Sequence, residues 1–155
     1  MSDKQTAKAM NTYPTVLIAS WIARLALAAA FLSAVADRLG LWGPPGSEGV
    51  AWGNVENYES YVALLNWYLP ASLIAPVGWL ATILEILIAI GLLVGWKLRW
   101  FALAAALLLT TFATTMCCAL GPKPPLDYSV LSAASAAFLL FAVSVPVGPK
   151  QPTAE

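Results

Sequence analysis

The stretch GWLATILEILIAIGLLVGW, residues 78–96, carries a single charge, Glu85, in an otherwise almost wholly apolar run. Its length is close to the ~20 residues that span the hydrocarbon core of a bilayer. Because lipid offers the backbone no hydrogen-bonding partners, a segment that spans the bilayer should be an α-helix. The stretch therefore predicts a transmembrane helix with a carboxylate inside it, and that carboxylate needs a partner.

The composition of the whole chain points to the same class of protein. Hydrophobic residues make up 60% of the 155 residues and charged residues only 10%, whereas a soluble domain is about 25% charged. The net charge is zero, so nothing indicates a nucleic-acid partner. The chain has no histidine, the commonest metal ligand and general base. We expect a protein embedded in the lipid bilayer, without a metal site and without nucleic acid.

Four apolar segments predict an all-α fold, an integral membrane four-helix bundle that forms one domain over residues 1–155. The long connection between the first two segments has aromatic and aliphatic residues at helical spacing, which predicts an amphipathic helix at the outer membrane interface. The four predicted spans cover residues 14–36, 71–94, 98–120 and 128–147, and the outer loop with its interfacial helix covers 37–70.

The basic residues predict the orientation of the bundle. Four spans place both termini on one side, together with the turn between the second and third spans. Basic residues favour the cytoplasmic side. The side with the termini holds Lys4, Lys8, Lys97, Arg99 and Lys150, and the opposite side holds Arg38 and Lys123. We therefore expect a multi-pass protein of the bacterial inner membrane with both termini in the cytoplasm.

Arg24 is the natural candidate to pair with Glu85. Each lies about nine residues from the cytoplasmic end of its predicted helix, which places both roughly 13–14 Å deep. An unpaired arginine at the centre of a bilayer costs about 2.5–3.5 kcal/mol. The sequence predicts that the two side chains meet across adjacent helices. Three roles remain open: a structural pair that fixes helix register, a polar anchor or proton-exchange site for a ligand, and a contact with a partner protein.

The third predicted helix carries further polar candidates. Thr111 and Thr115 share a face that would extend the polar lining of the bundle interior. Cys117 and Cys118 are adjacent near the outer end of this helix, and they are the two cysteines of the chain. A disulfide between neighbouring residues does not fit regular helix geometry. Two packed thiols and a redox-active pair both remain open, because the spacing is not that of a CxxC motif.

Three stretches of the chain resemble the DoxX family of small four-helix bacterial membrane proteins. They are ARLALAAAFLSAVADRLGLWG in the first helix, ATILEILIAIGLLVGWKLRW in the second and PLDYSVLSAASAAFLL before and in the fourth, so the resemblance covers residues 17–140. It implies a four-helix membrane fold and a place in membrane-bound redox complexes such as thiosulfate:quinone oxidoreductase. It also implies that Arg24 and Glu85 are the family's characteristic arginine and acid.

Two functions of different kinds follow. The first is a non-catalytic subunit or anchor of a membrane-bound redox complex, with other membrane proteins of that complex as partners. Quinone or lipid would then be the ligand of the interior around Arg24, Glu85 and Thr111. The second is a thiol or sulfur oxidoreductase component that uses Cys117 and Cys118 with quinone as electron acceptor. A membrane assembly factor is a further alternative.

Overall fold

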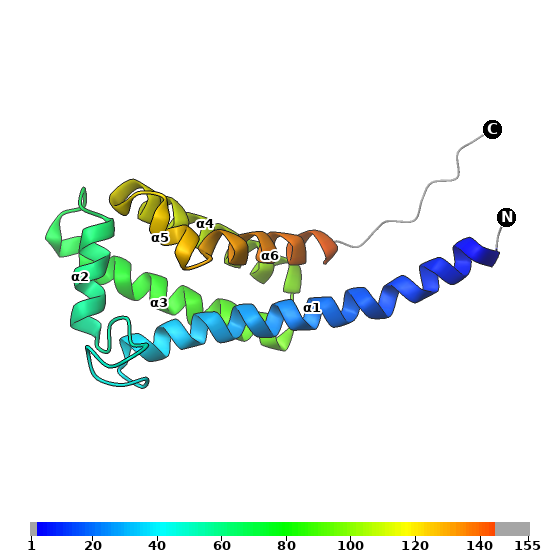
Figure 1. The fold of residues 1–155 in the computed structure, drawn as a ribbon, viewed down its shortest axis with the longest axis horizontal. Helices are drawn as coiled ribbons and strands as arrows, with labels where there is room; N and C mark the ends of the chain where they lie inside the picture. The colour runs from blue at the N-terminus through cyan, green and yellow to red at the C-terminus, as the bar shows by residue number, and fades with distance from the viewer. Residues whose placement is uncertain (1–2, 145–155) are drawn as a thin grey trace.

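The structure, a computed structural model, describes residues 3–144, and that part contains helices and loops but no strand, as the predicted all-α fold requires (Figure 1). The longer helices run along one direction, and a shorter one, α2 (Val55–Leu65), crosses them at one end. The elements are α1 (Asp3–Arg38), α2 (Val55–Leu65), α3 (Ala71–Val94), α4 (Leu98–Leu120), α5 (Lys123–Asp127) and α6 (Val130–Val143).

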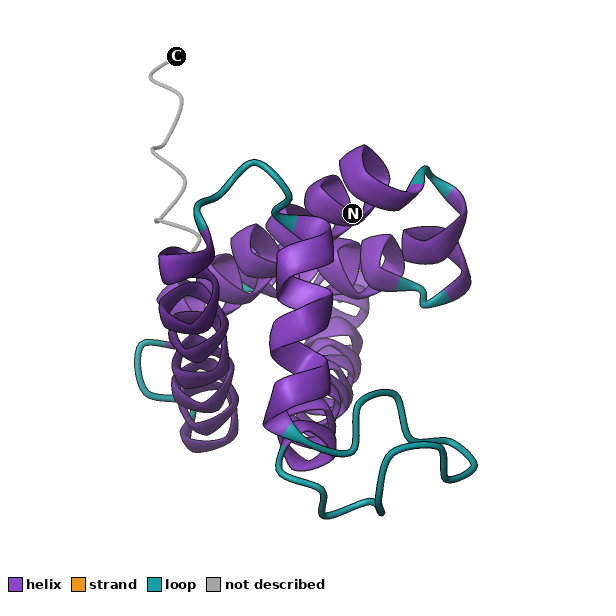
Figure 2. Cartoon of the chain, turned by 90° about the vertical axis from the view of Figure 1, so that its left-hand side faces the viewer, coloured by secondary structure: helices purple, strands orange, loops and turns teal. Residues whose placement is uncertain are grey.

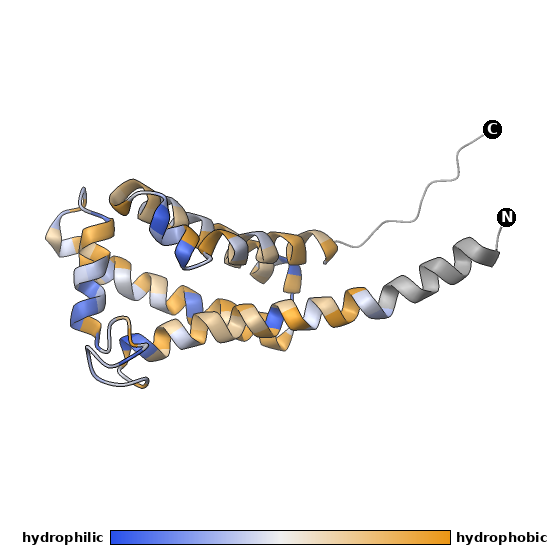
Figure 3. Cartoon of the chain, viewed as in Figure 1, coloured by the Kyte–Doolittle hydropathy of each residue, from blue (hydrophilic) through white to orange (hydrophobic). Residues whose placement is uncertain are grey.

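Three of these helices are long and apolar enough to cross a membrane: Pro14–Arg38 within α1, together with α3 and α4. Apolar residues dominate them, with isolated hydrophilic positions inside α1 and α3 (Figure 3). The bundle is that of an integral membrane protein. Because lipid accepts apolar side chains, many leucines and isoleucines stay exposed on the outside of the bundle.

The fourth predicted span, 128–147, is wrong at its start. Ser129 has a left-handed backbone, with φ 55°, and separates the short helix α5 from α6. The apolar helix α6 therefore begins at Val130 and has 14 residues. Residues 145–147 of the predicted span lie outside the described part of the chain.

The first helix is longer than predicted at both ends. The apolar run suggests residues 14–36, whereas α1 extends over Asp3–Arg38 with Pro14 inside it. The polar residues on either side of an apolar run can continue its helix beyond the apolar core of the membrane. The extension matters at the C-terminal end, because it brings Arg38 into the helix.

Small residues allow the helices to approach closely. Ala89 of α3, Ala102 and Ala105 of α4 and Ala137 of α6 are fully inaccessible, and Gly91 of α3 lies directly against the ring of Phe101. Small residues at helix interfaces are how membrane bundles gain van der Waals contact without a hydrophobic driving force between helices. The helices α3, α4 and α6 are therefore in close contact at these positions.

Helix α2 confirms the predicted helix in the long connection. Asn54 caps it by accepting a hydrogen bond from the N–H of Asn57 at 2.8 Å. Its buried face carries Tyr58 and Val62, which pack on α3 at Gly78, where even a Cβ would lie 3.2 Å from the tyrosine ring. Figure 2 looks onto this end of the bundle, with α2 lying across the long helices.

Candidate functional site: a buried ion pair beneath α2

Glu85 forms a buried ion pair with Arg38, the last residue of α1. Nη1 of Arg38 lies 2.5 Å from Oε2 of Glu85, and Nη2 donates to Oε1 at 2.9 Å. The exposed fraction is 4% for Arg38 and 1% for Glu85. Two parallel hydrogen bonds between a guanidinium and a carboxylate are the strongest arrangement for such a pair. The carboxylate therefore uses both of its oxygens within the protein.

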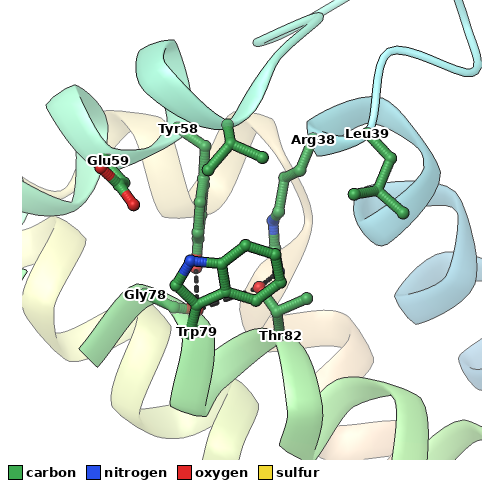
Figure 4. Close-up of a pocket in the computed structure, with 8 residues that line it drawn as sticks. Arg38, Leu39, Tyr58, Glu59, Gly78, Trp79 and Thr82 are labelled. Carbon is green, nitrogen blue, oxygen red and sulfur yellow. Dashed lines mark hydrogen bonds between the residues drawn. The ribbon is translucent and has the colours of Figure 1, made fainter. Parts of the chain in front are cut away.

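Side chains from α2 and α3 complete the surroundings of the Arg38 guanidinium (Figure 4). Its Nη1 also donates to Oγ1 of Thr82 at 2.9 Å, and Thr82 in turn donates to the carbonyl of Gly78. The guanidinium carbon lies 4.1 Å from the centroid of the Tyr58 ring and 5.3 Å from that of Trp52. The Tyr58 hydroxyl donates to the Gly78 carbonyl, and burial raises the pKa of this hydroxyl, which keeps it protonated.

The neighbouring residue Asp37 holds the loop that follows α1. Its two carboxylate oxygens accept hydrogen bonds from the backbone N–H groups of Ala51, Trp52 and Gly53 at 2.8, 2.9 and 2.8 Å. This fixes Trp52 beside the guanidinium of Arg38. Two consecutive residues at the end of α1 thus have different roles. Arg38 pairs with Glu85 of α3, and Asp37 holds the loop that covers this pair.

The space next to the ion pair is small. A pocket of about 10 Å³ lies between α1, α2 and α3, lined among others by Arg38, Tyr58, Glu59 and Trp79. This is roughly the volume needed for one water molecule. The Nε of Arg38 is buried here and has no hydrogen-bond partner in the described part of the chain. A quinone ring or a lipid head group would not fit unless α2 moved.

The predicted pair between Arg24 and Glu85 does not form. Arg24 instead donates from Nε to the carbonyl of Leu92 at 2.6 Å and from Nη2 to that of Leu93 at 2.9 Å. Its guanidinium stacks on Trp21 at 3.7 Å. The two carbonyls belong to the C-terminal end of α3, where the helix dipole favours a cation. Glu85 lies roughly two turns, or about 10 Å, from Leu92 toward the N-terminal end of that helix.

The sequence contains a signal for the true partner. The buried face of α1 runs from Arg24 through Ala28, Phe31 and Val35 to Arg38, a spacing that places both arginines on one side of a helix. The apolar run ends at residue 36, and hydropathy alone therefore leaves Arg38 in the outer loop. Equal depth of Arg24 and Glu85 would also require the start of the predicted first span to lie level with the end of α3, whereas Arg24 itself lies at the end of α3.

The two threonines do not join this cluster. Thr111 is exposed, and its hydroxyl donates to the carbonyl of Leu107 on its own helix at 2.9 Å. Thr115 is partly buried and donates to the carbonyl of Phe112 at 3.0 Å. Local bonds of this kind satisfy a hydroxyl within its helix. The structure does not bring either residue to the Arg38–Glu85 pair.

The two cysteines lie near the C-terminal end of α4 as free thiols, with Cys117 partly buried and Cys118 exposed. Consecutive Cα atoms are ~3.8 Å apart, which is shorter than the roughly 4.4–6.8 Å that a disulfide favours. Within the helix the two thiols do not bridge to each other. No cluster of three or more metal-ligating side chains occurs among residues 14–144, whose side chains the structure describes.

A glycine pair tests the contact between Arg24 and the end of α3. Gly95 has φ +76°, and a Cβ there would lie 2.5 Å from Nη2 of Arg24, whereas Gly49 has φ +77° and nothing within 4 Å. We expect Gly95→Ala to lower the free energy of unfolding by about 1–3 kcal/mol more than Gly49→Ala, measured by denaturant titration in detergent. Equal losses would mean that Arg24 does not occupy this position.

The comparisons with known proteins give one family. A family model described as methylamine utilisation protein MauE matches residues 16–127. No curated protein and no solved structure matches the chain. The resemblance to DoxX is therefore wrong as a family assignment. It rested on the order and spacing of apolar helices with few specific residues, and these features do not distinguish one family of small helical membrane proteins from another.

Proposed function

Because the chain belongs to the MauE family of membrane proteins, we propose that it is a non-catalytic membrane subunit of a redox system that serves methylamine utilisation. The family description supplies the term methylamine utilisation. Conversion of methylamine and water to formaldehyde and ammonia oxidises the methyl carbon and releases two electrons, which a redox system must accept. A membrane protein in such a system would anchor or assemble the components that carry out this oxidation.

The geometry of the interior supports a non-catalytic role. A general acid or base must reach the proton that it transfers. Glu85 has both oxygens engaged by Arg38, and Arg24 donates to backbone carbonyls, so neither is free to act on a substrate. The observation that carries this part of the proposal is the bidentate Arg38–Glu85 pair beneath α2. Its role is then to fix α2 and the preceding loop as one rigid surface for a partner.

The orientation belongs to the same proposal. We place both termini in the cytoplasm of a bacterium and α2 on the outer side of its inner membrane. Lys97 and Arg99 lie at the end opposite α2, which agrees with the preference of basic residues for the cytoplasmic side. Fusion of green fluorescent protein to the C-terminus should give fluorescent cells, and fusion of alkaline phosphatase there should give no activity. The reverse result would invert the topology.

The experiment for the subunit role combines growth with purification. In the native host, deletion of the gene should abolish growth on methylamine as sole nitrogen or carbon source and leave growth on ammonium or sugar unchanged. A tagged copy purified in mild detergent from methylamine-grown cells should bring down further membrane or exported proteins. Normal growth of the deletion strain, or recovery of the tagged protein alone, would contradict the proposal.

The exposed thiol of Cys118 favours one second candidate, a thiol or sulfur redox component that uses the two cysteines. The variant Cys117→Ala/Cys118→Ala distinguishes the two functions. The subunit role predicts that this variant restores growth on methylamine in the deletion strain. The thiol role predicts no growth, although the variant protein accumulates in the membrane at the normal level.

A further inference from the structure

A second cavity opens at the end of the bundle opposite α2. It is a groove of about 650 Å³ between the first half of α1, the turn from α3 to α4, and the end of α6. Leu17 and Ser20 of α1 line one side, Val143 of α6 lines another, and Lys97 and Arg99 lie at the turn. A volume of this size falls within the range of ligand-binding pockets, roughly 300–1,000 Å³.

The groove carries positive charge that the described residues do not neutralise. No carboxylate lines it, and neither Lys97 nor Arg99 forms an ion pair with a side chain of residues 14–144. Both cations lie near aromatic rings instead: Lys97 is 4.6 Å from the centroid of Trp96, and Arg99 is 5.2 Å from that of Phe141. The groove is therefore suited to an anion.

The rest of the groove wall is apolar. Leu17 is 61% exposed and Val143 is 54% exposed. Trp96 and Trp100, 65% and 60% exposed, lie at the same turn between α3 and α4. Exposed tryptophans at the end of spanning helices mark the level of the lipid head groups. An occupant of this groove would meet two cations at head-group level and apolar side chains beside them.

We propose that this groove binds one anionic phospholipid, with its phosphate at Lys97 and Arg99 and an acyl chain along Leu17 and Val143. An anionic lipid of the cytoplasmic leaflet is the molecule that combines this charge with an apolar tail. The lipid site does not depend on the role of the chain in methylamine utilisation, but its assignment to the cytoplasmic leaflet rests on the proposed orientation.

The test is native mass spectrometry of the purified, delipidated protein in detergent, titrated with phosphatidylglycerol or phosphatidylcholine of identical acyl chains. We expect the wild type to bind one phosphatidylglycerol at least tenfold more tightly than phosphatidylcholine. In Lys97→Gln/Arg99→Gln the ratio of the affinities for phosphatidylglycerol and phosphatidylcholine should be about tenfold lower. Lys123→Gln removes a cation at the other end of the bundle and should leave the preference unchanged.

Two further measurements distinguish a lipid site from a simple anion site. Ser20→Phe keeps every charge and fills the groove, so it should weaken phosphatidylglycerol binding as strongly as the double variant does, with an unchanged melting temperature. Inorganic phosphate should not displace the lipid. Displacement by phosphate would reveal a simple anion site, and equal binding of both lipids, or normal binding by Ser20→Phe, would show that no anionic lipid occupies the groove. Each of these three results overturns the proposal.

Discussion

Arg38→Met is expected to lower the free energy of unfolding by about 3–5 kcal/mol, because it leaves the Glu85 carboxylate buried without a counter-ion. The loss should appear in reversible unfolding by denaturing detergent, followed by tryptophan fluorescence. The matched control is Lys123→Met. That lysine also pairs with a carboxylate, Asp127, but both side chains are more than half exposed, and such surface pairs contribute about 0–1 kcal/mol.

Double variants that remove Glu85 together with one arginine show whether Arg38 or Arg24 is its partner. Arg38→Met/Glu85→Met should recover most of the stability that Arg38→Met loses, since a buried ion pair is often replaceable by packed apolar side chains. Arg24→Met/Glu85→Met should not recover stability, because it leaves Arg38 buried and unpaired. If the Arg24→Met/Glu85→Met variant recovered stability and the Arg38→Met/Glu85→Met variant did not, α1 and α3 would be in a different register.

Asp37→Ala is expected to produce the second-largest effect, a loss of about 2–4 kcal/mol. Three backbone N–H groups of the loop before α2 lose a charged acceptor in this variant. Hydrogen bonds to charged groups contribute about 1.5–3 kcal/mol each, and relaxation of the loop toward water offsets part of the loss. Hydrogen exchange should then speed up throughout residues 39–65, while α4 keeps its protection.

The control for that variant is Glu48→Ala, which removes an exposed carboxylate from the same loop. It should leave both stability and exchange unchanged. If Asp37→Ala leaves exchange in the loop unchanged as well, the Asp37 carboxylate does not hold the loop. Rapid exchange confined to Ala51, Trp52 and Gly53 would show that the loop and α2 are not coupled.

The spans of α3 and α4 could be predicted from the sequence to the residue. Both are continuous apolar runs with clear boundaries: Pro70 precedes α3, Gly95 in a left-handed conformation ends it, and Gly121 follows α4. In such segments the length needed to cross the bilayer and the local preferences of the residues at the helix ends indicate the same boundaries. The helix in the long connection could be found for a similar reason, since its apolar residues repeat at helical spacing.

The partner of Glu85 could not be predicted in the same way. Hydropathy indicates which residues lie in the apolar core of the membrane, but it does not fix how far one helix is shifted along its neighbour. That shift depends on contacts such as the hydrogen bonds of Arg24 to the end of α3. It also depends on the folding of Arg38 into α1, two residues beyond the apolar run.

The most direct test of the Arg38–Glu85 pair is a solid-state NMR measurement of the dipolar coupling between the Glu85 carboxyl carbon and arginine guanidinium nitrogens. The protein would be embedded in lipid bilayers, and Glu85→Gln would assign the signal. We predict a strong coupling that persists in Arg24→Lys and disappears in Arg38→Lys. A coupling that persists in Arg38→Lys and disappears in Arg24→Lys would contradict the buried pair beneath α2 and the rigid surface inferred from it.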